Sequence, residues 1–162
     1  MKSLAVIILL QLVIAFNINA QPKLKLYGGK NHDQFLGYLS YIENDELNSI
    51  WSQFSDYGAT HSAKSIWNEN GIYGSKTSDY SSFNINAKYP PQVLDRNGKF
   101  YGYLTINKNN PKRSHSGMAD EICNNRDRIL EEGVEEYTEM FHTIHCGAVY
   151  EVNPIVFKPV IK

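Results

Sequence analysis

The sequence predicts a single-domain α+β protein, in which a small antiparallel sheet carries an inserted region of short helical turns and a C-terminal amphipathic helix. Three observations lead to this prediction. Two aromatic-rich segments with a central glycine echo each other, a 16-residue echo of Ser, Ile, Trp, Tyr and Gly lies between them, and the last third of the chain has apolar residues at helical spacing.

Residues 1–20 have the layout of a secretory signal peptide. Lys2 supplies a positive start, residues 4–16 form an apolar run, and Ala20 provides a small residue for cleavage. The run is too short to span a bilayer comfortably. We therefore expect a secreted or periplasmic mature chain, residues 21–162, with no membrane span. No Asn-x-Ser/Thr acceptor occurs, which favours bacterial export, and the remaining 142 residues (162 − 20) suffice for one hydrophobic core.

The first echo predicts two strands of the sheet. "FLGYLS", residues 35–40, matches "FYGYLT", residues 100–105, and each follows a turn-forming stretch. Gly37 and Gly102 lie within these strands, where a bulge or a close backbone approach is the usual reason for glycine. Two further strands complete the predicted sheet, in residues 23–27 and 91–94.

The predicted inserted region, residues 49–91, contains the 16-residue echo. Positions with this spacing in one continuous helix would lie about 160° apart around its axis, which excludes a single amphipathic helix. Each unit begins with a Ser that can cap a helix and continues with an apolar pair. We expect short helical turns that are pinned to the core by aromatic anchors and followed by Tyr-Gly turns. The expected structural anchors are Ile50, Trp51, Ile66, Trp67 and Phe83.

The C-terminal third is predicted to form an amphipathic helix over residues 118–146. Its apolar positions follow helical spacing with breaks at Arg126 and Gly133, and Gly147 follows its end. The opposite face is acidic, which indicates either a solvated surface or a docking surface for a cation or a basic partner. The acidic residues are Glu131, Glu132, Glu135, Glu136 and Glu139.

The repeats and the second aromatic strand together resemble a known group of proteins. "SIWNENGIYGS", the Pro90-Pro91 step and "NGKFYGYLTIN" are similar to features of small, mainly bacterial proteins that carry tandem Ser-Ile-Trp-Asn and Tyr-Gly-Ser units. The resemblance covers roughly residues 24–113, although Ser52 stands where the first unit should have Asn. It implies the repeat arrangement, and it implies no activity, catalytic residue or binding residue.

Charge and motifs narrow the classes of function. Without Lys2, the chain has 15 basic and 17 acidic residues, a net charge of about −2, which predicts neither a nucleic-acid partner nor an anionic membrane surface. The motifs of serine hydrolases, zinc proteases, P-loop enzymes, dinucleotide-binding enzymes and EF-hand proteins are missing from the sequence. We expect no cofactor. The carboxylates that the sequence cannot pair in space are Asp33, Glu43, Asp45, Asp56, Glu69 and Asp79.

Cys123, His142, His145 and Cys146 form the candidate metal cluster of the sequence. On a helix the two histidines share a face and the cysteines complete a tetrahedral zinc set, although the spacing is not that of a known zinc motif. Without a metal, histidines in a last helical turn are favoured by the helix dipole. A disulfide requires the chain to reverse near Gly133, because one unbroken helix would hold the two cysteine Cα atoms about 34 Å apart and a disulfide needs about 7 Å or less.

Two classes of function remain open. The first is a non-catalytic exported module that binds a surface ligand, a glycan or a protein, through aromatic faces and hydrogen-bonding Asn, Ser and Tyr side chains. The second is a small hydrolase of a cell-envelope polymer that uses carboxylates or histidines. We favour the binding module and expect contacts near the Tyr-Gly turns, where loops carry side chains to solvent. The predicted binding residues are Tyr57, Asn68, Asn70 and Tyr73.

Overall fold

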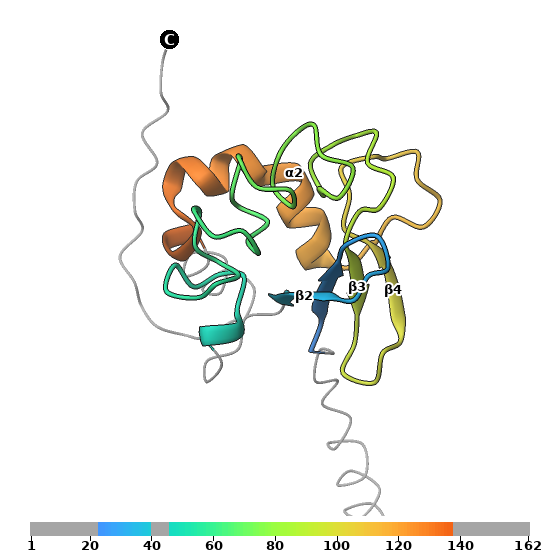
Figure 1. Ribbon diagram of the computed structural model, residues 1–162, viewed down its shortest axis with the longest axis horizontal. Helices are drawn as coiled ribbons and strands as arrows, with labels where there is room; N and C mark the ends of the chain where they lie inside the picture. Colours follow the sequence, from blue (N-terminus) through green and yellow to red (C-terminus); the bar gives the residue numbers. More distant parts are fainter. Residues whose placement is uncertain (1–22, 40–45, 138–162) are drawn as a thin grey trace, which may run out of the picture.

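The computed structural model of the protein describes residues 23–39 and 46–137, and it confirms an α+β fold with a small antiparallel sheet (Figure 1). The predicted signal peptide, residues 1–20, lies outside the described residues. The elements in chain order are β1 (Lys25–Gly28), β2 (Gln34–Tyr38), the 3-10 helix η1 (Glu46–Asn48), β3 (Gln92–Leu94), β4 (Phe100–Tyr103) and α2 (Gly117–Glu132).

The sheet has the strand order β2-β1-β3-β4, and each neighbouring pair is antiparallel. β1 and β2 form one hairpin, β3 and β4 form a second, and the pairing of β1 with β3 joins them. All four strands coincide with predicted segments, although β1 ends one residue after its predicted range and β2 begins one residue before its own. Because side chains alternate between the faces of a strand, one face buries Leu26, Leu36 and Val93, which are completely shielded from solvent. This face packs on the core.

A glycine-centred β-bulge interrupts each edge strand. Gly37 and Gly102 have φ angles of 103° and 107°, a conformation that side chains other than glycine rarely adopt. Lys25 and Tyr27 are two residues apart on β1, but their partners on β2, Tyr38 and Phe35, are three residues apart. The same extra residue occurs in β4 opposite β3. The first and fourth residues of each Phe-x-Gly-Tyr segment would lie on opposite faces of a regular strand, and the bulge places them on the same face.

Each bulge also brings its edge strand close to the chain beyond it. Parallel bridges join the last residue of each edge strand to the following loop. A Cβ atom on Gly37 would lie 3.1 Å from the carbonyl oxygen of Asn48, and one on Gly102 would lie 2.7 Å from the backbone nitrogen of Ser114. Both expected reasons for a mid-strand glycine, a bulge and a close backbone approach, therefore apply at both positions.

Residues 49–91, between η1 and β3, form consecutive turns without a helix, which differs from the short helical turns that the sequence predicted. We call these residues the turn segment. The hydroxyls of Ser49, Ser65 and Ser81 accept hydrogen bonds from the backbone N–H groups two residues later, at 3.1, 3.1 and 3.0 Å. Side-chain bonds of this kind compete with the helical hydrogen-bond pattern, so these serines close turns and do not cap helices.

Backbone hydrogen bonds in the turn segment advance by three residues, with an occasional step of four. The N–H groups of Ser62 and Ser65 each donate to the carbonyl three residues back. The longer steps, at Ala59 and Ser75, come directly after the Tyr-Gly pairs. One step of four and four steps of three give the 16-residue period of the echo. The echo therefore reflects turns of three residues with one extra residue in each unit.

The aromatic anchors of the turn segment form a buried column. Trp67 is fully buried, and its ring centroid lies 5.4 Å from that of Trp51 and 6.3 Å from that of Phe83. The indole N–H of Trp51 donates to the carbonyl of Leu39 at 2.8 Å, and that of Trp67 donates to the carbonyl of Ile50. These residues are structural, as predicted, because both the apolar surface and the polar group of each indole are satisfied inside the protein.

The predicted C-terminal helix is observed as α2, which ends at Glu132. The hydroxyl of Ser116 caps its N-terminus by accepting from the N–H of Ala119 at 3.3 Å. Asn125 departs from helical geometry and kinks the helix next to the break expected at Arg126. Gly133, with a φ of 100°, ends it at the second expected break. Of the predicted range 118–146, residues 138–146 lie outside the described residues.

Arg126 ties α2 to the turn segment, which lies beside it in Figure 1. Its buried guanidinium lies 4.6 Å from the ring centroid of Phe83, at the end of the aromatic column. One nitrogen donates to a carboxylate oxygen of Glu69 at 3.0 Å and to the carbonyl of Gly74 at 3.2 Å. The charge that interrupts the apolar pattern of the helix is therefore buried, and it is paired with the largely exposed carboxylate of Glu69.

Candidate functional site

The sheet face opposite the core carries partly exposed side chains. Because directly paired residues of antiparallel strands point to the same face, the strand registers arrange these side chains in two rows, each with one residue from every strand. Phe100 is the most open of them, with 40% of its surface exposed. The first row is Tyr38, Lys25, Leu94 and Phe100, and the second row is Phe35, Tyr27, Gln92 and Tyr103. We call this surface the aromatic face.

The rings of the aromatic face form two groups, one at each edge of the sheet. On the β2 side, the ring centroid of Phe35 lies 5.5 Å from Tyr27 and 5.5 Å from Tyr38. On the β4 side, Phe100 meets Tyr103 edge-on at 5.1 Å. Tilted and edge-to-face contacts at these distances are favourable between aromatic quadrupoles. The rings therefore hold one another in place while they stay partly exposed.

Two residues outside the strands extend the aromatic face. The ring of Tyr57, from the turn segment, lies 4.9 Å from Phe35 in an edge-on contact. At the opposite edge, the ring of His32 lies 5.7 Å from Tyr103, and its Nε2 atom is 3.1 Å from the carbonyl oxygen of Pro90. Among the described residues, His32 alone has a positive φ without being glycine, at 53°. A strained backbone is often retained where a side chain must be held at a functional surface.

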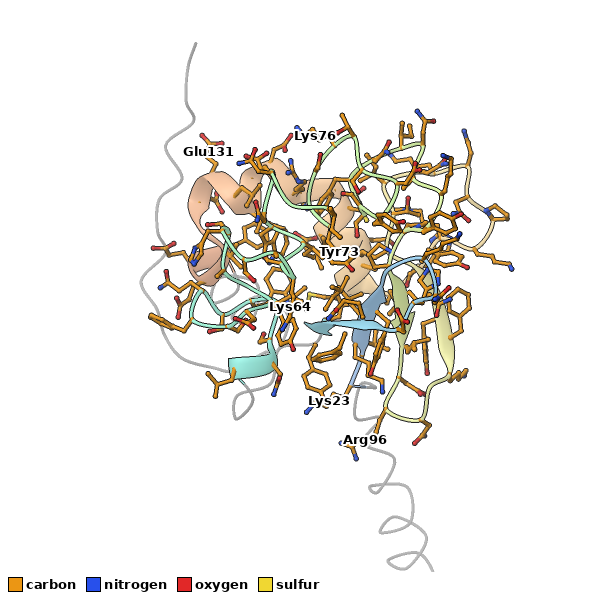
Figure 2. All side chains as sticks on the ribbon, in the orientation of Figure 1. Lys23, Lys64, Tyr73, Lys76, Arg96 and Glu131 are labelled. Carbon is orange, nitrogen blue, oxygen red and sulfur yellow. The ribbon has the colours of Figure 1, made fainter. Side chains whose placement is uncertain are left out.

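Lys25 is the one charged residue in the two rows of the aromatic face. The Lys25 ammonium lies in the first row, 5.4 Å from the ring centroid of Tyr27. The Lys23 ammonium lies 4.1 Å from the ring centroid of Tyr38. Figure 2 shows Lys23 and Arg96 projecting from the same end of the sheet. Neither row contains a carboxylate, so the face is suited to a neutral or anionic ligand with apolar surfaces.

The structure brings Tyr57, among the predicted binding residues, to the aromatic face. Asn68 is half-buried and holds a turn: its amide nitrogen donates to the carbonyl of Ser62 at 3.0 Å, and its amide oxygen accepts from the N–H of Asn70 at 3.0 Å. Asn70 is exposed on the turn segment. The amide of Asn68 therefore already has partners within the fold, which leaves it little capacity for a ligand.

Tyr73, the remaining predicted binding residue, lies inside the protein. It is 6% exposed, and a Cβ atom on Gly28 would come within 2.6 Å of its ring, which therefore packs against the core face of the sheet (Figure 2). Burial raises the pKa of its phenol, and the nearby Asp33 carboxylate raises it further. The Tyr-Gly turn thus points its tyrosine inward at this position.

The sequence also carries a local signal for the aromatic face, at residues that the predicted binding set does not include. A bulge at the glycine of Phe-x-Gly-Tyr implies that its two aromatic residues share a face. The buried residues of both central strands alternate with partly exposed ones, so that shared face had to be the open one. The sequence does not predict that the two hairpins pair through β1 and β3, because strand order depends on contacts between residues far apart in sequence.

Asp56, Asp79 and Glu69, three of the carboxylates considered in the sequence, each pair with a basic side chain at a separate place. Glu43 and Asp45 lie outside the described residues. The pairs are Lys64 with Asp56 at 3.2 Å, Lys88 with Asp79 at 2.8 Å, and Arg126 with Glu69 at 3.0 Å.

Cys123 is the member of the candidate metal cluster that falls within the described residues. It is partly buried on α2, and burial raises the pKa of its thiol to about 11 against the opposing effect of Arg113. His142, His145 and Cys146 lie outside the described residues, as does the proposed disulfide. Within residues 23–39 and 46–137, no group of three or more His, Cys, Asp or Glu side chains is placed to hold a metal ion.

In the part of the chain that the structure describes, no helix combines the length and the apolar character needed to cross a bilayer. The chain was compared with protein-family models, with curated proteins and with solved structures, and none of the three comparisons gave a match.

Proposed function

We propose that the protein is an exported, non-catalytic binding module, that its binding surface is the aromatic face, and that its ligand is a glycan. One observation carries the proposal: the two rows place the rings of both Phe-x-Gly-Tyr segments on one open face of the sheet, beside an amide and an ammonium group. Binding sites on proteins typically combine apolar and aromatic surface with a few placed polar groups.

The chemistry of the aromatic face matches that of sugars. A pyranose ring has an apolar face of C–H groups that packs on tyrosine and phenylalanine rings, while its hydroxyls require hydrogen-bond partners. The Gln92 amide offers both donors and acceptors, the tyrosine hydroxyls do the same, and Lys25 offers donors. Hydrolysis of a glycosidic bond generally needs a pair of carboxyl groups, one on each side of that bond. Neither row supplies one, so the face supports binding in preference to cleavage.

The aromatic face is also preorganised. Its rings stand on paired strands whose opposite side is buried, and contacts between 4.9 and 5.5 Å hold them against one another. A ligand therefore does not have to order mobile side chains, a cost of about 0.5–1.5 kcal/mol for each residue immobilised. This favours useful affinity from a shallow surface.

The test is a titration of the mature chain, residues 21–162, with soluble polygalacturonate and with dextran, followed by ¹H–¹⁵N chemical shifts. We expect shifts that map onto β1 to β4, and weaker binding in the variant Phe100→Ala. The matched control is Phe54→Ala, because Phe54 is 75% exposed and belongs to the turn segment and to neither row of the aromatic face. Shifts confined to other regions, or no shifts with either polymer, would overturn the proposal. So would release of new reducing ends that a single carboxylate-to-amide change abolishes while the fold stays intact.

A further inference from the structure

We infer that the aromatic face consists of two equivalent half-sites, and that a single chain of a carboxylate-bearing polysaccharide occupies both. The inference rests on the proposed function and specifies its ligand. It comes from the duplicated hairpin geometry and from the charges on the face.

The two half-sites are built in the same way. Half-site 1 consists of Phe35 and Tyr38 on β2, and half-site 2 consists of Phe100 and Tyr103 on β4. In both, a bulged glycine with a φ of 103° or 107° places the two rings on the open face. The ring centroids are 5.5 Å apart in half-site 1 and 5.1 Å apart in half-site 2, and both contacts are edge-on. The same sequence pattern thus yields the same edge-on pair of rings twice.

The strand registers relate the half-sites by a local two-fold axis perpendicular to the sheet, between β1 and β3. Tyr38 and Phe100 lie in the first row, whereas Phe35 and Tyr103 lie in the second, so equivalent residues occupy opposite corners of the face. Three strand-to-strand steps separate β2 from β4, which places the half-sites about 14 Å apart. One sugar unit is too small to contact both, and an oligomer is long enough.

This symmetry limits how a polymer can be recognised. A chain that crosses both half-sites meets the second in the direction opposite to the first. Hydrogen-bond patterns that depend on chain direction cannot then be satisfied equally at the two places. Stacking on ring faces and attraction between charges do not depend on direction. We therefore expect recognition through stacking and charge, with little discrimination between linkages.

The charges indicate an acidic polymer. Lys25 lies on a central strand between the two half-sites, and its ammonium is 5.4 Å from the ring centroid of Tyr27. With no carboxylate in either row, a uronate carboxylate that enters the face is attracted to this ammonium without meeting a like charge in the rows. Because the ammonium is near the surface, this part of the affinity should weaken as salt screens it.

The experiment compares galacturonic acid, oligogalacturonates long enough to span both half-sites, and dextran oligomers by isothermal titration calorimetry with the mature chain. We expect one oligogalacturonate per protein and an affinity at least about 100-fold above that of the monomer, as linked binding at two sites gives. Phe35→Ala and Phe100→Ala should each remove most of this gain, to similar extents, while Phe54→Ala retains it. Lys25→Gln should reduce the preference for oligogalacturonate over dextran, and Lys108→Gln, at an exposed loop position, should not.

The possible outcomes separate this inference from the proposed function. Two results would refute the two half-sites: equal affinities for monomer and oligomer, or a loss of affinity in only one of the two Phe variants. Neither result would contradict the binding of a glycan by the aromatic face. Equal binding of dextran and oligogalacturonate would refute the acidic ligand, and so would a preference for oligothymidylate as a probe of nucleic acid. Failure of every glycan to bind would refute both proposals. Circular dichroism of each variant must match that of the parent chain, because a misfolded variant loses affinity for an unrelated reason.

Discussion

Replacement of Gly102 by alanine tests the backbone geometry that builds half-site 2. A Cβ atom at this position would lie 2.7 Å from the backbone N and Cα atoms of Ser114 and 2.8 Å from the carbonyl oxygen of Lys112. All three are backbone atoms, so no side-chain rotation can relieve the overlap. Either the loop beyond β4 must move away from the strand, or the bulge must change its conformation.

The expected loss of stability has two parts. Holding alanine at a φ of 107° costs about 1–3 kcal/mol, and forcing a methyl group into a packed contact costs about 1–3 kcal/mol more. Gly102→Ala should therefore destabilise the protein by about 2–6 kcal/mol, a large part of the roughly 5–15 kcal/mol that stabilises a small domain. Gly98→Ala is the matched control, because Gly98 has a φ of 83° but no atom within 4 Å of the added Cβ. It should lose about 1–2 kcal/mol from conformation alone.

Urea unfolding of the two variants, followed by far-ultraviolet circular dichroism and tryptophan fluorescence, gives both free energies of unfolding. The difference between Gly102→Ala and Gly98→Ala isolates the close approach, since both variants contain alanine at a positive φ. If the two variants agree within about 0.5 kcal/mol, the range typical of substitutions without a structural consequence, the approach of Ser114 to β4 does not constrain the bulge and our reasoning fails.

Two further predictions concern the core and α2. Trp67→Ala should lower the free energy of unfolding by about 3–5 kcal/mol, because Trp67 is fully buried. Trp67→Phe should lower it by about 1–3 kcal/mol, because the Ile50 carbonyl loses its hydrogen-bond donor. An unchanged urea midpoint for Trp67→Ala would contradict the structural role of the buried aromatic column. Burial raises the pKa of the Cys123 thiol to about 11, so this thiol should react with iodoacetamide at pH 8 far more slowly in the folded reduced protein than in urea. Mass spectrometry of its tryptic peptide measures both rates, and equal rates would contradict its burial. Because this folded-state pKa exceeds the unfolded value of 9.0, the unfolded thiol loses its proton first, and the contribution of Cys123 to stability should fall as the pH rises from 9.0 to about 11.

The strands could be predicted because their signals are local. Aromatic residues between turn-forming stretches mark β2 and β4, and a glycine within each strand marks its bulge. The kink and the end of α2 were similarly visible as a charge and a glycine in an apolar helical pattern, at Arg126 and Gly133. These features depend on a few neighbouring residues, so one sequence suffices to find them.

The turn segment was harder to predict because two structures share its pattern. A serine followed by an apolar pair is typical of a helix N-cap, and it is equally compatible with a turn in which the serine hydroxyl accepts from the N–H two residues later. The recurrence of Ser, Asn or Gly at about every third position favours consecutive turns over a helix, because each such residue interrupts a helix before it can propagate. That shorter period was hidden within the 16-residue echo.

The candidate site could be predicted least, because it depends on the direction in which aromatic side chains point. Tyr57 and Tyr73 occupy equivalent positions in the echo, yet Tyr57 reaches the edge of the aromatic face and Tyr73 lies against Gly28 in the core. Each is followed by a glycine, Gly58 or Gly74, whereas the residues before them differ. The difference lies in what each turn packs against, which is set by contacts between the turn segment and the sheet.

The two echoes in this sequence use aromatic residues for opposite purposes, and the backbone decides which. In the turn segment, the N–H groups of Trp51 and Trp67 find carbonyl partners inside the protein, so burial of these rings leaves no polar group unsatisfied. In the sheet, the bulges at Gly37 and Gly102 place two rings of each hairpin on the face that the core does not cover. A regular strand would have divided the same residues between the two faces. Loss of either bulge should therefore dismantle one half-site while the column of Trp51, Trp67 and Phe83 retains its packing, which separates the surface for binding from the interior that supports it.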